Sequence, residues 1–353
     1  MSRFFSEKYS ALTPYTPGEQ PQDMKYIKLN TNESPYPPSS KALSRASEAS
    51  ARMHLYPDPE CRTLTEKIAE LCGLSFPQVL VTNGSDEILN FAFMAFCDEK
   101  HPAYFPDISY GFYSVFAELN GVPYKEIPLC EDFTINLDDY KNLEGTIFVA
   151  NPNAPTGIAL TLSEIEKLIL QNPKSVVVID EAYVDFGTES ALSLIDKYDN
   201  LLVTQTFSKS RSMAGARLGF GAGNRELIQD LNTIKYSTNP YNINTMTMAA
   251  GIGVLEDAEY TEKNCKAVMK AREYTVKELS KLGFSMTDSK ANFIFAKHSS
   301  VGGEKLYREL KSRGILVRHF KKPRLCEHLR ITIGTEEQMK VLVNTLSDIL
   351  EGR

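Results

Sequence analysis

The chain has 353 residues, of which 42% are hydrophobic and 24% charged, with a net charge of −6 at pH 7. This length exceeds what one small core uses, so we expect a large domain joined to a smaller one. The sequence lacks a basic stripe, a long apolar run and a signal peptide, which predicts no nucleic-acid and no membrane partner. Its six scattered cysteines form no CxxC pair, which predicts reduced thiols in the cytoplasm and no metal site.

The first forty residues are rich in Pro, Tyr and Asn, and we expect residues 1–30 to form an extended arm that packs with the small domain. A repeated strand–loop–helix pattern follows in "QVLVTNGSDEILNFAFMAF", "AYFPDISYGFYSVFAEL", "GTIFVANPNAPTG", "SVVVIDEAY" and "NLLVTQTFSK". The β-branched run at 176–179 is typical of parallel strands covered by helices on both faces. The pattern predicts a mostly parallel α/β sheet in a large domain, residues 31–245.

A different pattern begins after about residue 245. Consecutive helices are predicted in "NTMTMAAGIGVLED" and "TEKNCKAVMKAREYTVKELSKLG". Strands and helices then alternate through "ANFIFAK", "EKLYRELKSRG", "ILVRHF", "HLRITIG" and "TEEQMKVLVNTLSDIL". These segments predict a second, smaller α/β domain over residues 246–353.

Polar residues stand after the predicted strands of the large domain, where open α/β sheets bind their ligands. They are Ser85 and Asp86, Asp180 and Tyr183, Ser208 and Lys209, and Arg217. Each has an ordinary explanation when taken alone, such as a helix cap, a paired carboxylate or a surface lysine. Together they predict one crevice that holds a phosphate-sized site, an acid, a tyrosine, a lysine and an arginine.

The ligand that uses all of these groups is pyridoxal 5′-phosphate. A lysine amine condenses with its aldehyde, an aspartate keeps its pyridine nitrogen protonated, and a tyrosine hydroxyl bonds its phenolic oxygen. A helix N-terminus, a serine and an arginine suit its phosphate. Lys209 stands among small residues, which suits an amine that has to be neutral and to reach an aldehyde.

The sequence resembles the fold-type I, pyridoxal-phosphate-dependent aminotransferases of class I and II and, within them, the histidinol-phosphate aminotransferases. The resemblance covers nearly the whole chain. The motifs that carry it, in the family's order, are "LTPYTPGEQP", "LNTNESPYPP", "LYPDPE", "NGSDEIL", "PDISYGFY", "NPNAPTG", "DEAYVDF", "TFSKSRSMAGARLGF" and "LRITIGT". It implies a mostly parallel central sheet in a large domain and a smaller α/β C-terminal domain.

The resemblance also implies a role for each candidate residue at the cofactor. Lys209 would be the Schiff-base lysine and the general base and acid of the transfer, with Asp180 on the pyridine nitrogen and Tyr183 on the phenolic oxygen. Tyr110 would stack on the ring. The phosphate would be held by Ser85, Asp86, Ser208 and Arg217.

Further residues would complete the site from a distance. Tyr56 would reach the cofactor phosphate of the partner subunit, which implies a homodimer with shared active sites. Arg330 would bind a substrate carboxylate, and Tyr15 and Arg318 would help to hold a distal phosphate, provided that the strands of the two arginines are neighbours.

The sequence departs from the family before "PTG", where the family usually has an asparagine that bonds the phenolic oxygen. Here Ala154 stands at that position, preceded by Asn153. Either Asn153 takes over this role or Tyr183 acts alone. The sequence of the lysine loop, "SKSRSMAGAR", also differs from the one more usual in the family.

The implied activity is transfer of an amino group between glutamate/2-oxoglutarate and histidinol phosphate/imidazole-acetol phosphate, a step of histidine biosynthesis. Two alternatives keep the cofactor: an aminotransferase for aromatic or other amino acids, and a phosphoamino-acid decarboxylase of the cobalamin pathway. A third is a binding or regulatory protein without turnover, which the presence of Lys209, Asp180 and Arg330 disfavours.

Overall fold

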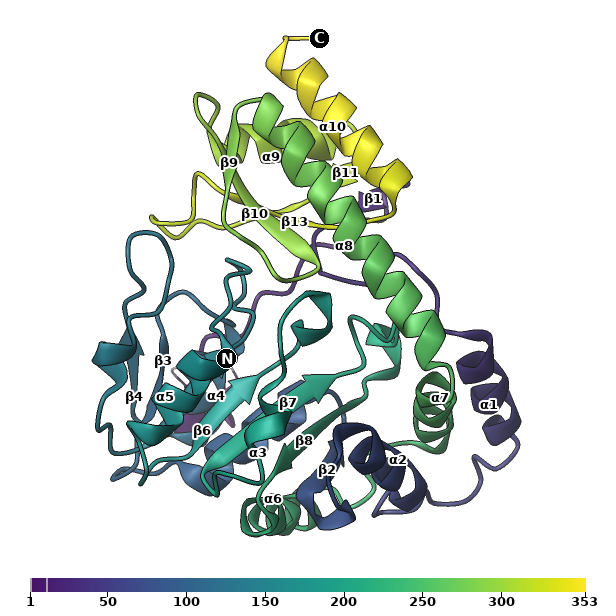
Figure 1. Cartoon of the computed structure of the whole chain (residues 1–353), viewed down its shortest axis with the longest axis vertical. Coiled ribbons are helices and arrows are strands. Elements are labelled where there is room, and N and C mark those ends of the chain that lie inside the picture. Colours follow the sequence, from purple (N-terminus) through teal and green to yellow (C-terminus); the bar gives the residue numbers. More distant parts are fainter. Residues whose placement is uncertain (1, 11) are drawn as a thin grey trace.

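The computed structural model describes residues 2–10 and 12–353 (Figure 1). These residues form three sheets, and the two larger ones organise the chain. The larger sheet has seven strands in the order β2-β8-β7-β6-β5-β3-β4. These strands are β2 (Val79–Thr82), β3 (Ala103–Pro106), β4 (Tyr124–Ile127), β5 (Thr146–Ala150), β6 (Val177–Asp180), β7 (Leu201–Thr206) and β8 (Gly219–Gly223). The neighbours from β7 to β4 pair in parallel, and β8 runs antiparallel to β7 and β2. The predicted mostly parallel sheet is thus confirmed.

Helices cover both faces of this sheet because its central strands are apolar on both sides. Ile147 and Val149 of β5 contribute to one buried cluster, together with residues of α2, α5 and α7. Phe148, between them, contributes to the opposite cluster with residues of α3, α4 and α6. The helices of this body are α1 (Ser40–Ser50), α2 (Arg62–Cys72), α3 (Ser85–Phe96), α4 (Phe112–Asn120), α5 (Leu162–Leu170), α6 (Arg225–Thr238) and α7 (Thr245–Leu255).

The smaller body has an antiparallel sheet in the order β12-β13-β10-β9, packed against three helices (Figure 1). Its elements are α8 (Ala258–Lys281), β9 (Phe284–Met286), β10 (Phe293–His298), α9 (Gly303–Ser312), β12 (Arg318–His319), β13 (Leu329–Thr332) and α10 (Glu336–Leu350). Figure 1 shows α8 running from α7, beside the large sheet, into the small body.

The N-terminal arm joins the small body through a two-stranded parallel sheet. Strand β1 (Ile27–Lys28) pairs with β11 (Ile315–Leu316). The predicted strand "ILVRHF" is therefore divided, because its first half pairs with the arm and its second half, β12, pairs with β13. Short 3₁₀ helices lie at η1 (Glu7–Tyr9), η2 (Phe76–Gln78), η3 (Leu137–Tyr140), η4 (Val184–Phe186), η5 (Ala191–Leu194) and η6 (Ala214–Ala216).

The change from the large to the small body lies later than residue 245. Helix α7 contacts α1 and α2, and its residue Val254 belongs to a buried cluster of the large sheet. The buried cluster of the small body takes its first α8 residue at Cys265. We therefore propose that the segment from 245 to 255 belongs to the large domain, because it packs there.

All six cysteines lie within the described residues and are free thiols. In the same part of the chain, every helix is too short or too polar to cross a bilayer.

Candidate active site

A cavity of about 290 Å³ lies at the carboxyl ends of the parallel strands of the large sheet. It collects polar side chains from segments that are far apart in the sequence. The predicted site residues that line it are Ser85, Asp86, Tyr110, Asp180, Tyr183, Ser208, Lys209 and Arg217. The structure therefore brings the strand-end residues to one place, where an open α/β sheet binds its ligands.

Asp180 is the last residue of β6 and is 4% exposed. Its Oδ2 accepts a hydrogen bond from the Tyr113 hydroxyl at 3.1 Å, whereas its Oδ1 has no partner among the described residues. Burial raises the pKa of this carboxyl to about 7, although the hydrogen bond from Tyr113 opposes the rise. A buried oxygen without a donor is unfavourable, so this position favours a ligand that brings its own N–H group.

Lys209 follows β7, and its side chain lines the same cavity. Its Nζ donates to the Thr31 carbonyl at 3.4 Å and lies 5.8 Å from the centre of the Tyr183 ring. Burial lowers the pKa of Lys209 to about 8, and the positive charge of Arg330 adds to the lowering. Near neutral pH this amine has a larger neutral fraction than an ordinary lysine, and the neutral amine is the form that attacks a carbonyl carbon.

The Tyr183 hydroxyl is oriented by a side chain from the N-terminal segment. Asn32 donates through Nδ2 to the Tyr183 hydroxyl at 3.0 Å, and Asn32 Oδ1 accepts from the Thr332 hydroxyl at 3.0 Å. Burial raises the pKa of Tyr183, while the charge of Arg330 opposes the rise. The hydroxyl therefore keeps its proton, and because Asn32 already supplies a donor, that proton is available to an acceptor in the cavity.

The first turn of α3 and the Arg217 side chain form an anion site. Gly84 precedes the helix with φ +76° and ψ 169°, a backbone conformation that favours glycine, and a Cβ there would also displace the Arg217 guanidinium, whose Nη2 would lie 2.6 Å away. Arg217 donates to Asp86 Oδ2 at 3.0 Å and to Ser208 Oγ at 3.4 Å, and the Tyr110 hydroxyl donates to Asp86 Oδ1 at 2.6 Å. Free N–H groups at the helix start, a guanidinium and a hydroxyl together suit a phosphate.

Asn153 is not brought to the cavity. Its Nδ2 donates to the Ile108 carbonyl at 2.9 Å and to Thr156 Oγ1 at 3.1 Å, and its Oδ1 accepts from Ser109 Oγ at 2.8 Å. The amide is thus occupied in holding its own loop, and Ala154 lines the cavity instead. Of the two hypotheses for "NPNAPTG", the position of Asn153 favours the one in which Tyr183 bonds the phenolic oxygen without Asn153.

Two arginines occupy paired positions on neighbouring strands of the small domain. Arg318 on β12 stands directly opposite Arg330 on β13, so the strands of the two arginines are neighbours as the hypothesis requires. Arg330 donates through Nη2 to the Asn30 carbonyl at 2.9 Å, while its Nε has no partner among the described residues. Arg318 donates to the carbonyls of Thr16 and Pro17, each at 3.2 Å.

Tyr15 and Tyr56 lie outside the walls of the 290 Å³ cavity, as do the two arginines. Tyr15 stacks on Phe112 with ring centres 4.3 Å apart. Tyr56 is 84% exposed, stacks on Tyr241 at 4.7 Å and borders a different cavity beside α7. A single chain therefore does not bring Tyr56 to Lys209.

Two functional side chains escaped the sequence prediction, Tyr113 on Asp180 and Asn32 on Tyr183. Both lie inside motifs that the sequence analysis uses, "PDISYGFY" and "LNTNESPYPP". The motifs marked the right segments, but only the folded chain shows which of their residues meet the acid and the tyrosine.

The residues of this cavity fit pyridoxal 5′-phosphate. Asp180 has a buried oxygen that finds no donor among the described residues, Tyr183 has a proton to donate, and Lys209 has an amine of lowered pKa. The helix start and Arg217 line the same cavity and are groups that suit a phosphate. This combination of groups defines the class of pyridoxal-phosphate-dependent enzymes.

The chain belongs to the family of class I and II aminotransferases, whose family model matches residues 24–346. It is 50% identical to the histidinol-phosphate aminotransferase of Brachyspira hyodysenteriae, over 99% of this chain and 100% of the relative. The crystal structure of the histidinol-phosphate aminotransferase from Clostridium acetobutylicum has a TM-score of 0.84 and 25% identity, covering 93% of this chain and all of its own. That of the Sinorhizobium meliloti enzyme with pyridoxal-5′-phosphate has a TM-score of 0.87 at 21% identity, covering 100% and 99%, which supports the fold.

The raised pKa of Asp180 predicts a stability effect in the cofactor-free protein. The folded value of about 7 exceeds the ordinary value of about 3.9, so folding favours the protonated acid, and its contribution is lost as pH rises through 7. Asp180→Asn should therefore stabilise the cofactor-free protein at pH 8 by roughly 1–4 kcal/mol, at about 1.4 kcal/mol per pKa unit, and far less at pH 4. Urea denaturation at both pH values measures this difference.

The matched control is Asp288→Asn, because the Asp288 side chain is 84% exposed. This substitution should change stability little at either pH. A gain for Asp180→Asn of equal size at pH 4 and pH 8 would show that the charge of Asp180 is not its cause.

Proposed function

We propose that this chain is a pyridoxal-phosphate-dependent histidinol-phosphate aminotransferase. It transfers an amino group between glutamate/2-oxoglutarate and histidinol phosphate/imidazole-acetol phosphate, a step of histidine biosynthesis. The observation that carries the proposal is one cavity in which Lys209, Tyr183 and an Asp180 oxygen without a donor stand beside a phosphate site. Relatives of this name that are 45–50% identical over nearly their whole length support the substrate.

When bound, pyridoxal phosphate supplies an aldehyde that takes up amino groups and a ring that withdraws electrons from the substrate carbon. Asp180 would hold the ring nitrogen in its protonated form through the Oδ1 that has no donor of its own. The Tyr113 hydroxyl keeps the carboxylate in place. Tyr183 would donate to the phenolic oxygen, and the α3 N-terminus, Ser208 and Arg217 would hold the phosphate.

Lys209 is the group that would move the proton. Its amine would be the covalent anchor of the cofactor and would be freed when the amino donor takes its place. Once free, its lowered pKa lets the neutral amine accept a proton from the substrate Cα and return it to the carbon that received the nitrogen. One nitrogen on one flexible side chain would serve both positions, so a single residue would act as base and acid.

The substrate end of the site would come from the small domain and the arm. Arg330 Nε has no partner in the described part of the chain, and its planar guanidinium would bind a carboxylate. Arg318 would add a second guanidinium where the substrate ends in a phosphate, exchanging its present bonds to the carbonyls of Thr16 and Pro17 for the anion. Tyr15 on the arm would contribute a hydroxyl.

The active unit is proposed to be a homodimer with shared sites. Three large apolar side chains gather in the segment between α1 and α2: Met53, Leu55 and Tyr56 are 65%, 58% and 84% exposed. Such a group on a surface is typical of a protein–protein contact. A second copy that covers this segment would receive Tyr56 at its own phosphate site.

Lys209→Ala tests the reaction. Turnover of glutamate with imidazole-acetol phosphate should fall at least about 10³-fold, because one change removes both the covalent anchor and the proton-transfer group. Lys340→Ala on α10, an exposed lysine, should leave the rate unchanged. Borohydride reduction of the wild-type protein followed by peptide mapping should label Lys209, and a label on another lysine would refute the site.

The same assay separates the alternative activities. Glutamate alone should yield 2-oxoglutarate once per active site, which a decarboxylase or a mere binder of the cofactor does not produce. A panel of acceptors with phenylpyruvate and 2-oxoisovalerate beside imidazole-acetol phosphate then ranks the substrates. A preference for phenylpyruvate would identify an aromatic aminotransferase instead.

Arg318→Ala tests the phosphate end of the substrate. It should weaken kcat/KM for the phosphorylated acceptor by about 1.5–3 kcal/mol, the worth of a hydrogen bond to a charged group, and affect phenylpyruvate far less. Arg313→Ala is a control, because Arg313 lies in the same domain and bonds Glu309 and the Arg353 carbonyl. Equal losses on the two acceptors would remove Arg318 from phosphate recognition.

Subunit mixing tests the shared site. Lys209→Ala and Tyr56→Ala should each be nearly inactive, while their mixture should recover about one quarter of wild-type activity. Random pairing makes half of the dimers mixed, and each mixed dimer contains one intact site of two. Absence of recovery after demonstrated exchange of subunits would count against a site completed by the neighbour.

A further inference from the structure

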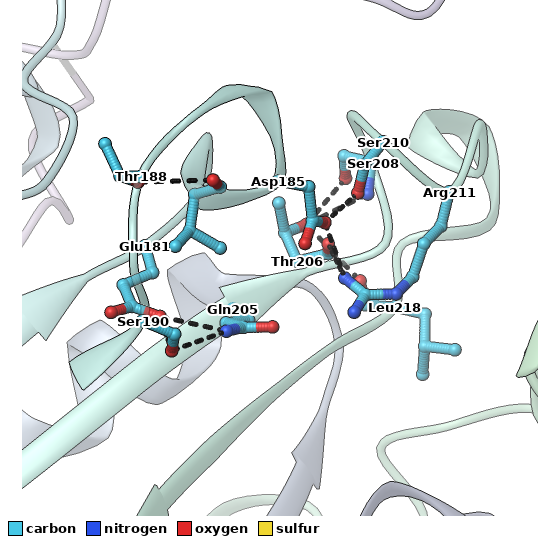
Figure 2. Close-up of polar contacts among 11 residues, drawn as sticks. Glu181, Asp185, Thr188, Ser190, Gln205, Thr206, Ser208, Ser210, Arg211 and Leu218 are labelled. Carbon is cyan, nitrogen blue, oxygen red and sulfur yellow. Dashed lines mark hydrogen bonds and ion pairs between the residues drawn. The ribbon is translucent and has the colours of Figure 1, made fainter. Parts of the chain in front are cut away.

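The loop that carries Lys209 is held by side chains that do not line the 290 Å³ cavity. Lys209 lies between Ser208 and Ser210, and the two serines bond to different partners. Ser208 Oγ accepts from Thr206 Oγ1 at 2.9 Å, whereas Ser210 Oγ donates to Asp185 Oδ2. Figure 2 shows the Asp185 carboxylate directed toward Ser210 and Arg211.

Arg211 completes this contact as a nearly buried cation. Its side chain is 10% exposed, and Nη1 donates to Asp185 Oδ2 and to the Thr206 carbonyl, each at 3.4 Å. The guanidinium lies over the Phe207 ring, 4.9 Å from its centre. Arg211 therefore binds the residues before Lys209 and, through Asp185, the serine after it. The Asp185 side chain is 33% exposed, so this ion pair is buried on the arginine side and partly open to water on the carboxylate side.

Asp185 lies in η4, directly after the turn that presents Tyr183. Its contacts with Ser210 and Arg211 thus connect the turn after β6 with the loop after β7. Neither Asp185 nor Arg211 lines the 290 Å³ cavity; both border a separate cavity of about 270 Å³ against α8. The pair therefore touches neither cofactor nor substrate, yet it ties together the two segments that carry Tyr183 and Lys209.

We propose that Asp185 and Arg211 are positioning residues for the amino-transfer reaction. Acting through Ser210, they fix the Lys209 segment relative to Tyr183, so that the Lys209 amine meets the cofactor aldehyde in a single orientation. The sequence "SRS" belongs to the part of the lysine loop that differs from the family's more usual loop. The same contact explains it, because Ser210 and Arg211 are the residues that bind Asp185. This inference rests on the proposed function.

The test measures how fast Lys209 attaches to pyridoxal 5′-phosphate added to the cofactor-free protein. In this step the neutral amine adds to the aldehyde carbon and water leaves, and the new C=N bond is followed by absorbance. Arg211→Met and Asp185→Asn should each slow attachment about tenfold or more, as expected when a reacting group is displaced by about an ångström. The double variant should be no slower than either single variant, since each breaks the same pair.

A second measurement separates positioning from general damage. In a Lys209→Ala background the non-covalent affinity for pyridoxal 5′-phosphate should not change when Arg211→Met is added, because the pair acts through Lys209. Arg211→Lys, which keeps the charge, should restore part of the attachment rate. Lys266→Met is the matched control, because Lys266 borders the same 270 Å³ cavity but pairs with Glu262.

Three results would overturn the inference. The first is attachment at the wild-type rate in both single variants, and the second is slower attachment in Lys266→Met. The third is a loss of pyridoxal 5′-phosphate affinity, caused by Arg211→Met in the Lys209→Ala background, that equals its loss of attachment rate. A failure of the proposed function looks different, because the wild-type protein itself would then not attach pyridoxal 5′-phosphate at Lys209. If Arg211→Met does not fold, Asp185→Asn and Arg211→Lys still decide, since each changes the pair with little change in volume.

Discussion

The candidate site depends on one buried carboxylate, that of Asp180. Asp180 ends a strand that is covered on both faces, and one of its oxygens lacks a donor among the described residues. Keeping a charge there without a partner is unfavourable, so the cofactor-free chain contains an acid that a cationic N–H group would satisfy. The same burial depresses the pKa of Lys209. A water-poor strand end thus produces both the acid that anchors a ring and the amine that reacts with it.

The part of the site that would bind the substrate depends on a different interaction, that of two arginines with an anion. Arg330 and Arg318 come from neighbouring strands of the small domain, and their present acceptors are backbone carbonyls of the N-terminal segment. Neutral carbonyls are weak partners for guanidinium groups compared with carboxylate or phosphate. If these arginines bind substrate as proposed, an anionic substrate would meet two partly satisfied cations, in a body distinct from the one that would hold the cofactor.

Much of this arrangement follows from local sequence patterns. Apolar runs that end in Asp180 or in Ser208 and Lys209 predict buried parallel strands, and topology then gathers their ends. The contact between Asn32 and Tyr183 could not be predicted, because it joins a left-handed turn at φ +55° to a residue 151 positions away. The direction of the Asn153 side chain could not be predicted either. Its position beside Ala154 suggests that it lines the cavity, but the folded loop directs its amide toward Ile108 and Thr156.

The pairing of β1 with β11 has a consequence for the order in which the protein is made. The arm leaves the ribosome first, yet Ile27 has no strand to pair with until Ile315 has been synthesised. The large sheet, whose last strand ends at Gly223, is complete much earlier. Domains generally fold as units during synthesis, so the half of the site that would hold the cofactor forms while the half that would bind substrate is still being translated. A nascent chain would thus gain its cofactor pocket before its substrate pocket.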